Sequence, residues 1–111
     1  MVNWLDVCGI NDLQADSGIC ALLERQQVAI FSILDQVYAV GNYDPIGKAN
    51  VLSRGLVGDL KGQMVVASPL YKQHFNLSTG VCLEDETVKI PIYTIRIENN
   101  RVQINSFIAH T

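Results

Sequence analysis

The sequence predicts an all-β domain made of small packed antiparallel sheets. Apolar residues make up 49% and charged residues 17% of the 111 residues, a balance that suits a folded domain with a core and argues against disorder. Short apolar segments alternate with clusters of turn-forming residues, and no segment shows the periodicity of a long helix. Because short strands with this spacing pair with their neighbours, we expect a single domain over residues 1–111.

The first part of the chain contains a predicted meander of strands. Its segments are rich in the aliphatic and β-branched residues that half-buried strands prefer, and neither Pro nor Gly interrupts residues 19–40. The Asx residues and the glycine of residues 10–18 are typical of a loop. The predicted strands are residues 3–9, 19–24, 28–34 and 37–40.

Residues 41–61 have a different character. Several glycines together with Pro45 predict a long irregular loop, with a short helical turn near residues 49–52. Long loops inside a compact domain usually carry function, so this segment is a candidate part of a site. A strand over residues 63–67 follows.

The clearest hairpin lies near the C-terminus, over residues 87–105. Asn99 and Asn100 can both adopt the positive φ angles of a two-residue type I′ turn, and that turn fixes the register of the strands. The register pairs Ile97 with Val102 and Ile95 with Ile104. The sequence assigns no partner to residues 107–111, and we expect this tail to be loosely held.

A second loop, residues 66–80, begins as a strand, turns at Ser68-Pro69, forms another short strand and closes on Thr79-Gly80. Two loops share residues with a family pattern. The matching positions are Pro45 and Gly47 in residues 41–47, and Pro69, Phe75, Asn76, Leu77, Thr79 and Gly80 in residues 66–80. On these positions the two segments resemble the cluster-binding loops of Rieske iron–sulfur proteins. The resemblance implies a Rieske-like fold with both loops at one end, residues 41–85 forming a loop subdomain inserted in a β base.

The positions at which that family places its cluster ligands are Asp44, Ile46, Ser68 and Tyr71 in this chain. A Rieske centre is held by two thiolates and two imidazoles, whereas isoleucine has no lone pair and neutral hydroxyls are poor substitutes. His74 lies three positions beyond the last ligand position. We therefore expect no metal in this chain, with Asp44 forming an Asx turn before Pro45 and the Tyr71 ring filling the space left by the cluster.

Composition and charge exclude several other classes of function. The net charge of −3 provides no basic surface for nucleic acid, and no apolar run approaches the roughly 20 residues that span a bilayer. The glycines of residues 53–59 lack the spacing of a phosphate-binding loop, so we do not expect this chain to bind a dinucleotide. The N-terminus shows no secretory signal, and we expect a cytoplasmic protein without membrane contact.

The three cysteines are an odd number without a Cys-x-x-Cys pair, which predicts reduced and mostly buried thiols. Cys82 is the candidate nucleophile. Its neighbours Glu84, Asp85 and Glu86 would raise a thiol pKa rather than lower it. We therefore expect no catalytic residue in the chain.

Several segments carry a narrower resemblance: Trp4 and residues 20–22, 28–31, 43–46, 51–59, 67–73 and 82–85. They are similar to the small subunits of NAD(P)H-dependent assimilatory nitrite reductases, and the similarity covers the chain from about Trp4 to Ile104. It implies a Rieske-like fold without a cluster. It also implies a large partner subunit that carries FAD, an iron–sulfur cluster and sirohaem and uses NAD(P)H to reduce nitrite to ammonium.

The resemblance implies an accessory subunit that binds the large subunit through its loop end and supports assembly or electron flow. The residues that we expect to contact the partner are Asp44, Arg54, Lys72, Gln73 and His74. Two alternatives stay open. One is a small Rieske-type ferredoxin with unusual ligands, for which Asp44, His74 and Cys82 are the candidates. The other is a free-standing module whose cleft binds a small ligand.

Overall fold

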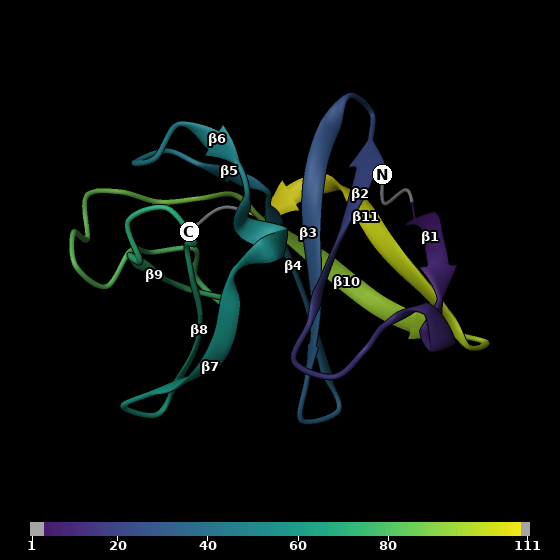
Figure 1. Cartoon of the computed structure of the whole chain (residues 1–111). Helices are drawn as coiled ribbons and strands as arrows, with labels where there is room; N and C mark the ends of the chain where they lie inside the picture. The colour runs from purple at the N-terminus through teal and green to yellow at the C-terminus, as the bar shows by residue number, and fades with distance from the viewer. Residues whose placement is uncertain (1–3, 110–111) are drawn as a thin grey trace.

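Strands supply most of the regular structure. In the computed structural model, which describes residues 4–109, they form a six-stranded, a three-stranded and a two-stranded antiparallel sheet (Figure 1). The largest sheet contains, in spatial order, β1 (Trp4–Gly9), β11 (Arg101–Ala109), β10 (Ile92–Glu98), β4 (Gln36–Gly41), β3 (Gln26–Ile33) and β2 (Gly18–Leu23). The smaller sheets contain β7 (Leu56–Leu60), β8 (Gln63–Ala67) and β9 (His74–Asn76), and β5 (Tyr43–Asp44) with β6 (Ala49–Asn50). The predicted all-β fold is confirmed.

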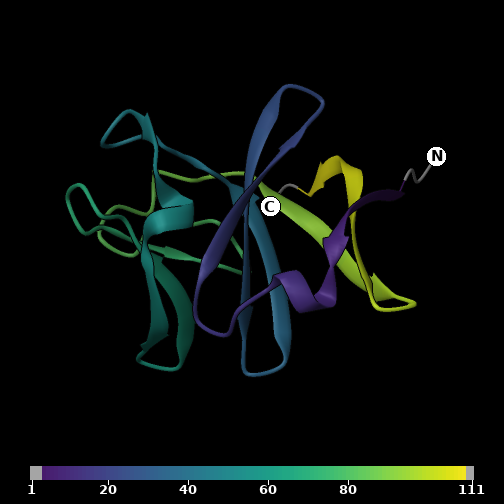
Figure 2. The ribbon, with the colours of Figure 1, turned by 45° about the vertical axis from the view of Figure 1, so that its right-hand side comes forward.

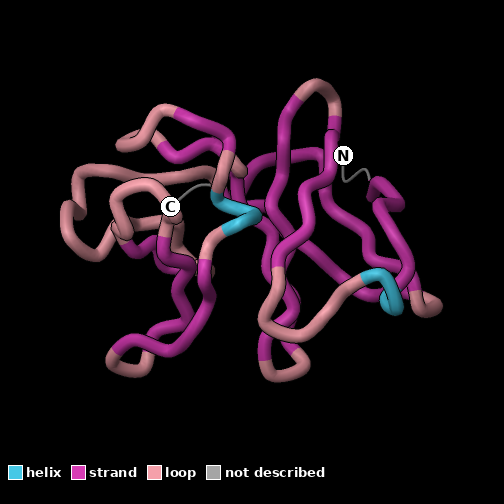
Figure 3. Tube along the Cα trace, viewed as in Figure 1, coloured by secondary structure: helices cyan, strands magenta, loops and turns pink. Residues whose placement is uncertain are grey.

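The helical elements of the described residues are two short 3-10 turns, η1 (Ile10–Asp12) and η2 (Leu52–Arg54) (Figure 3). Neither is long or apolar enough to cross a membrane. The two smaller sheets lie on one side of the meander formed by β2, β3 and β4, and β1, β10 and β11 lie on the other side (Figure 1, Figure 2). The loops that resemble a cluster site therefore belong to one half of the molecule.

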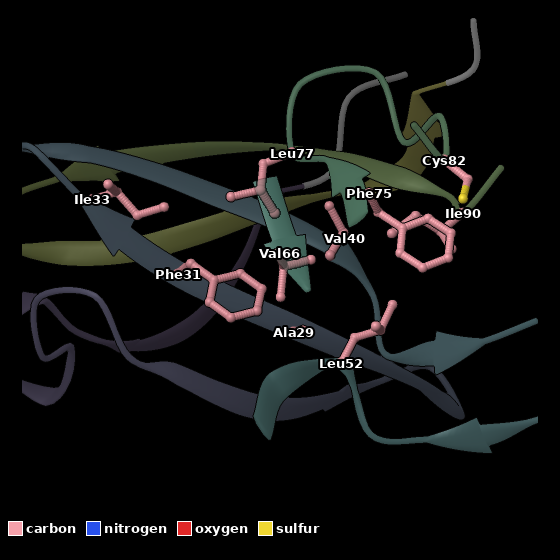
Figure 4. Close-up of a cluster of buried hydrophobic side chains, with 10 residues drawn as sticks. All are labelled: Ala29, Phe31, Ile33, Val40, Leu52, Val66, Phe75, Leu77, Cys82 and Ile90. Carbon is pink, nitrogen blue, oxygen red and sulfur yellow. The ribbon is translucent and has the colours of Figure 1, made fainter. Parts of the chain in front are cut away.

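Strand β3 lies between the two halves, and both of its faces are buried. Successive side chains of a strand point to opposite faces, so a strand covered on both sides has a continuous apolar run. Residues 28–31 are such a run. On one side is a base cluster, which comprises Val28, Ile30, Ala39, Tyr93 and Ile104. On the other is a loop-side cluster, which comprises Ala29, Phe31, Ile33, Val40, Leu52, Val66, Phe75, Leu77, Cys82 and Ile90 (Figure 4).

The predicted strands of the first part are confirmed with small shifts. Strands β2, β3 and β4 each begin one or two residues before the predicted starts. The first strand begins at Trp4, and Asn3 lies outside the described residues. Residues 10–18 form a loop as predicted, except that η1 occupies its start and Gly18 already belongs to β2.

The C-terminal hairpin is confirmed in its turn and register. Asn99 and Asn100 have φ angles of 52° and 63°, as a type I′ turn requires. The strands pair Ile97 with Val102 and Ile95 with Ile104. This turn therefore sets the register that the sequence predicts.

The predicted ends of the hairpin are wrong. Its first strand begins at Ile92 rather than at residue 87, because the preceding residues bond instead to the second loop: the Ile90 amide donates to the Gly80 carbonyl over 2.9 Å. The predicted loose tail is also wrong as far as the structure describes it. After a shift in register, the backbone of β11 continues to Ala109, which pairs with Ile92. Residues 110–111 lie outside the described residues.

The segment 41–61 is more regular than predicted, because its second half contains strand β7. Gly58 and Asp59 have low strand propensity and concealed this strand in the sequence. It forms a tight hairpin with β8 in which Lys61 and Gly62 have φ angles of 53° and 84°. The Gly62 amide also donates to Asp59 Oδ1 over 2.7 Å. Tertiary pairing and turn geometry thus outweigh the weak local signal.

The predicted helical turn near residues 49–52 is misplaced, because the helical turn lies about one turn further along the chain. Ala49 and Asn50 instead pair with Tyr43 and Asp44, and η2 begins at Leu52. Leu52 has no exposed surface and packs in the loop-side cluster, so this turn anchors the segment to the core.

Candidate functional site at the loop end

Asn42 fixes the start of the first loop. Its side chain is 2% exposed; Nδ2 donates to Gln27 Oε1 over 2.9 Å, and Oδ1 accepts from the Ser53 amide over 2.7 Å. The Asn42 carbonyl also accepts from the Leu52 amide over 3.1 Å. One buried side chain therefore joins β3, the first loop and η2. Asn42 was not predicted to have a role, although an asparagine between a buried strand and the Tyr43-Asp44-Pro45 turn is a signal of such a link.

Asp44 is fully buried, and both of its carboxylate oxygens accept hydrogen bonds. Oδ1 accepts from the amides of Ile46 and Gly47 over 2.8 and 3.0 Å, which is the predicted Asx turn. Oδ2 accepts from the Ser68 hydroxyl over 2.5 Å. Asp44 therefore both shapes the first loop and links it to the second.

Ser68 organises the second loop in the same way. It is 1% exposed; its amide donates to the Gln73 carbonyl over 2.9 Å, and its carbonyl accepts from the Lys72 amide over 3.0 Å. The Leu70 amide lies 3.3 Å from Ser68 Oγ, and Lys72 has a φ of 61° at the turn. The second loop thus folds back on Ser68, whose hydroxyl bonds to Asp44 at its base.

The side chains at the two other ligand positions, Ile46 and Tyr71, lie in different surroundings. Ile46 is half-buried and packs against the loop-side cluster, whereas Tyr71 is 66% exposed. The prediction that the Tyr71 ring fills the space left by a cluster is therefore wrong. Leu70 covers the turn instead: a Cβ atom on Gly47 would lie 2.5 Å from Leu70 Cδ1 and 2.9 Å from Asp44 Oδ2. Only glycine permits this close contact of the two loops.

These four residues do not fit a Rieske centre. The side chains of Asp44 and Ser68 are hydrogen-bonded to each other. Ile46 offers no lone pair, and the Tyr71 side chain is exposed to solvent. Across residues 4–109, no group of three or more His, Cys, Asp or Glu side chains is placed to hold a metal ion. The unusual ligand set that an alternative hypothesis requires, Asp44 with Cys82 and His74, is thus not brought together.

Cys82 and His74 belong to a separate arrangement around Glu84. His74 Nδ1 lies 2.7 Å from Glu84 Oε2, and the His74 amide donates to Oε1 over 2.7 Å. Burial alone would raise the pKa of Glu84, but the bonds from His74 outweigh it and lower the pKa of this carboxyl. Burial raises the pKa of the Cys82 thiol, which lies 3.7 Å from Glu84 Oε1. A raised pKa keeps the thiol protonated and so lowers its reactivity as a nucleophile.

The predicted partner-binding residues differ in exposure. Arg54 and Lys72 are exposed, His74 and Gln73 are half-buried, and Asp44 is enclosed. Gln73 Oε1 is buried and accepts no hydrogen bond from the described residues. Three exposed apolar or aromatic side chains at or beside the ligand positions were not predicted as contacts, although aromatic and aliphatic side chains inside turns are a signal of a contact surface. These residues are Tyr43, Leu70 and Tyr71, which are 47%, 44% and 66% exposed.

Comparison with known proteins places these features in a family. The sequence profile of the Rieske-like [2Fe–2S] domain matches residues 3–105. The NADH nitrite reductase small subunit of Escherichia coli (strain K12) is 46% identical over 106 residues, which cover 94% of this chain and 98% of that protein. The chain belongs to the nitrite reductase small-subunit family of Rieske-like domains.

Solved structures agree with this family. The solution structure of the nitrite reductase [NAD(P)H] small subunit from Erwinia carotovora superposes with a TM-score of 0.77 at 42% identity, covering 97% of this chain and 87% of that one. The predicted Rieske-like fold is therefore confirmed.

A further relative has a different architecture. The nitrite reductase [NAD(P)H] large subunit of Klebsiella oxytoca is 38% identical to this chain over 103 residues, which are 93% of this chain but 11% of that protein. In that protein, a segment similar to nearly all of this chain is part of the large chain itself.

Proposed function

We propose that this chain is the small accessory subunit of an NADH-dependent nitrite reductase and binds the large subunit through its loop end. The observation that carries the proposal is the bond between Asp44 and Ser68, which closes the loop end with protein atoms and leaves an apolar surface exposed. The relatives named as small subunits support it. So does the large subunit that contains a similar segment, because two modules joined in one chain remain together.

The loop end has the composition of a protein contact surface. Tyr43, Leu70 and Tyr71 supply exposed apolar and aromatic groups, and Lys48 and Lys72 add positive charge beside them. The two loops are held together before binding, so little conformational freedom is lost when a partner covers them. This surface suits an apolar recess with an acidic rim on the large subunit.

The predicted contact residues have different roles in this proposal. Lys72 and Arg54 are exposed and would touch the partner directly, and His74 would do so at the edge of the second loop. Asp44 is enclosed, so its part would be to hold the loops in position. Gln73 would add little beyond shaping the loop, since its side-chain oxygen is buried.

We further propose that the chain works without a cluster of its own. The ligand positions support this, because their side chains are bonded to each other, packed in the core or exposed. NADH, FAD, sirohaem and an iron–sulfur cluster would then belong to the large subunit. The three cysteines are free, which suits the reducing cytoplasm. The prediction that they are mostly buried is wrong, because Cys82 is buried but Cys8 is half-buried and Cys20 is exposed.

The test is co-purification with the large subunit from the same source. The tagged chain should retain the large subunit at a one-to-one ratio, with the flavin and sirohaem absorption of the eluate as the readout. Leu70→Ser combined with Tyr71→Ser should weaken the complex about tenfold or more, because both side chains are exposed at the loop end. Leu34→Asn at the β3–β4 turn, where Leu34 is 76% exposed, is the matched control.

Two results would contradict the proposal. If the tagged chain retains no large subunit on co-purification, the proposed function is wrong. Iron and acid-labile sulfide at one cluster per chain, measured after anaerobic purification of the small chain alone, would show that it carries a redox centre and would revive the ferredoxin alternative.

A further inference from the structure

One face of the three-stranded sheet packs on the core, and the other is more open, although Val65 on it is only 4% exposed. Val57, Val66 and Phe75 lie opposite one another across β7, β8 and β9. Val66 and Phe75 belong to the loop-side cluster (Figure 4), and Val57 packs against it. The positions that alternate with them face away from the core. Leu56 and His74 both pair with Ala67 on this outer face.

The outer face contains a hollow of about 260 Å³ lined mainly by apolar residues. Gly58 lines it, and nothing lies within 4 Å of the position that a Cβ atom on Gly58 would take. Leu56 stands beside it and is 80% exposed, the most exposed large apolar side chain of the described residues. What distinguishes Leu56 from the exposed Leu22 and Leu34 is that it lines this hollow, beside the open space over Gly58.

We propose that this hollow receives an apolar side chain of the large subunit and forms the second half of the interface that begins at the loop end. The proposal rests on the proposed function, because it takes the large subunit as the partner. It adds a contact on the outer face of the three-stranded sheet, at a place that no cluster ligand position occupies.

The hollow is continuous with the loop end along the chain. Ala67 lines the hollow and precedes Ser68, whose hydroxyl bonds to Asp44. His74 lines the other side and follows Lys72 and Gln73 of the second loop. A partner that covers the second loop therefore lies next to the hollow, and one surface can contact both.

The hollow is too small to form an interface by itself. A specific interface buries roughly 1,200–2,000 Å² of surface, whereas a hollow of about 260 Å³ accepts only one or two side chains. It can contribute to a complex as part of a larger contact. A pocket that takes one apolar side chain is the form in which a small area contributes much of the affinity.

The edge of the hollow is held in place. His74 is fixed by two bonds to Glu84, through its ring nitrogen and its amide, each over 2.7 Å. Asn76 Nδ2 donates to Gln63 Oε1 across the neighbouring strands over 2.9 Å. The hollow therefore exists before a partner arrives, as a recognition pocket requires.

The decisive experiment fills the hollow. In Gly58→Val, the new side chain enters open space, and valine is favoured in strands, so the variant should unfold at the same temperature as the unaltered chain or higher. Its affinity for the large subunit, measured by titration with the purified holoprotein, should fall about tenfold or more. Thr94→Val, at an exposed position of β10, is the matched control and should bind normally.

A second pair of variants tests the contribution of the exposed Leu56 side chain. Leu56→Ser should weaken the complex, whereas Leu22→Ser on β2, where the leucine is 72% exposed, should not. Neither change should lower the unfolding temperature strongly, because both side chains are mostly exposed in the free chain.

The outcomes separate the two proposals. If the unaltered chain does not bind the large subunit, the proposed function is overturned and this inference with it. If the unaltered chain binds and Gly58→Val binds equally well, this inference alone is overturned. A self-association of the unaltered chain that Gly58→Val abolishes, with normal binding to the large subunit, would also overturn it and assign the hollow to a second copy.

Discussion

The base cluster and the loop end of this protein are stabilised by different forces. The base cluster consists of apolar side chains that are at most 9% exposed, and its stability comes from apolar area removed from water. The loop end depends on Asn42, Asp44 and Ser68, which are equally buried but polar, and on hydrogen bonds between particular atoms. Apolar burial tolerates changes of shape, whereas each of these bonds requires one donor and one acceptor. A family can therefore alter the chemistry of the loop end while the base keeps the fold.

The largest expected effect comes from a cavity in the base. Ile30→Ala removes three carbon atoms from a side chain with no exposed surface, so unfolding free energy should fall by about 2–5 kcal/mol. Urea unfolding measures the loss, and amides in both halves of the molecule should lose protection together. Leu22→Ala, at a 72% exposed position, is the control. A loss below about 1 kcal/mol for Ile30→Ala would contradict the role given to this cluster.

A smaller and local effect is expected at the loop end. Asp44→Ala leaves the Ser68 hydroxyl and two amides without an acceptor, which destabilises the protein by about 1–3 kcal/mol. Hydrogen exchange should accelerate at the amides of Ile46 and Gly47, while the amides of β3 keep their protection. Equal acceleration in β3 would show that the loop end and the base are not separable.

Ser68→Ala and the double variant complete a mutant cycle for this bond. Because the two side chains touch, their changes should be non-additive by about 0.5–3 kcal/mol. Additive losses would mean that the bond between Asp44 and Ser68 contributes nothing of its own.

The smallest effect concerns the link between Glu84 and His74, and it depends on pH. The folded-state pKa of Glu84 is lowered, so the link stabilises the fold above the ordinary glutamate pKa of about 4.3 and is lost as pH falls through the lower, folded value. Since the Glu84 side chain is 46% exposed, the contribution should be below about 1 kcal/mol. Glu84→Gln should therefore be slightly less stable than the unaltered chain at pH 7, and the difference should vanish at strongly acidic pH. A difference that grows on acidification would have the wrong sign.

The base was more predictable from sequence than the loop end, for a physical reason. Alternating side chains and the Asn99-Asn100 turn are local signals, and they specify the C-terminal hairpin down to its register. Strand β7 was hidden because Gly58 carries no strand signal, and its pairing with β8 depends on the turn at Gly62. The extension of β11 to Ala109 was likewise hidden, because its partner is the distant Ile92.

The candidate site shows the same limit. The Asx turn of Asp44 follows from residues two and three positions away and was predicted correctly. The bond to Ser68 joins residues 24 positions apart, and sequence gives no measure of that distance. Tyr71 was predicted to fill the interior because it occupies a ligand position, but Leu70 packs against Gly47 and Tyr71 is exposed to solvent. Which of two neighbouring side chains points inward depends on the loop backbone, and that is set by its tertiary contacts.

The hydrogen bond between Asp44 and Ser68 joins the two loops in a way that does not depend on the concentration of any ligand. A loop pair that a metal centre holds together has a stability that rises with the concentration of free metal and falls when a chelator or an oxidant removes it. The free energy of a hydrogen bond between two side chains of the same chain does not depend on a ligand concentration. Its contribution to stability is therefore the same in an iron-poor and an iron-rich cell. The surface formed by Tyr43, Leu70 and Tyr71 is therefore in place as soon as the chain has folded.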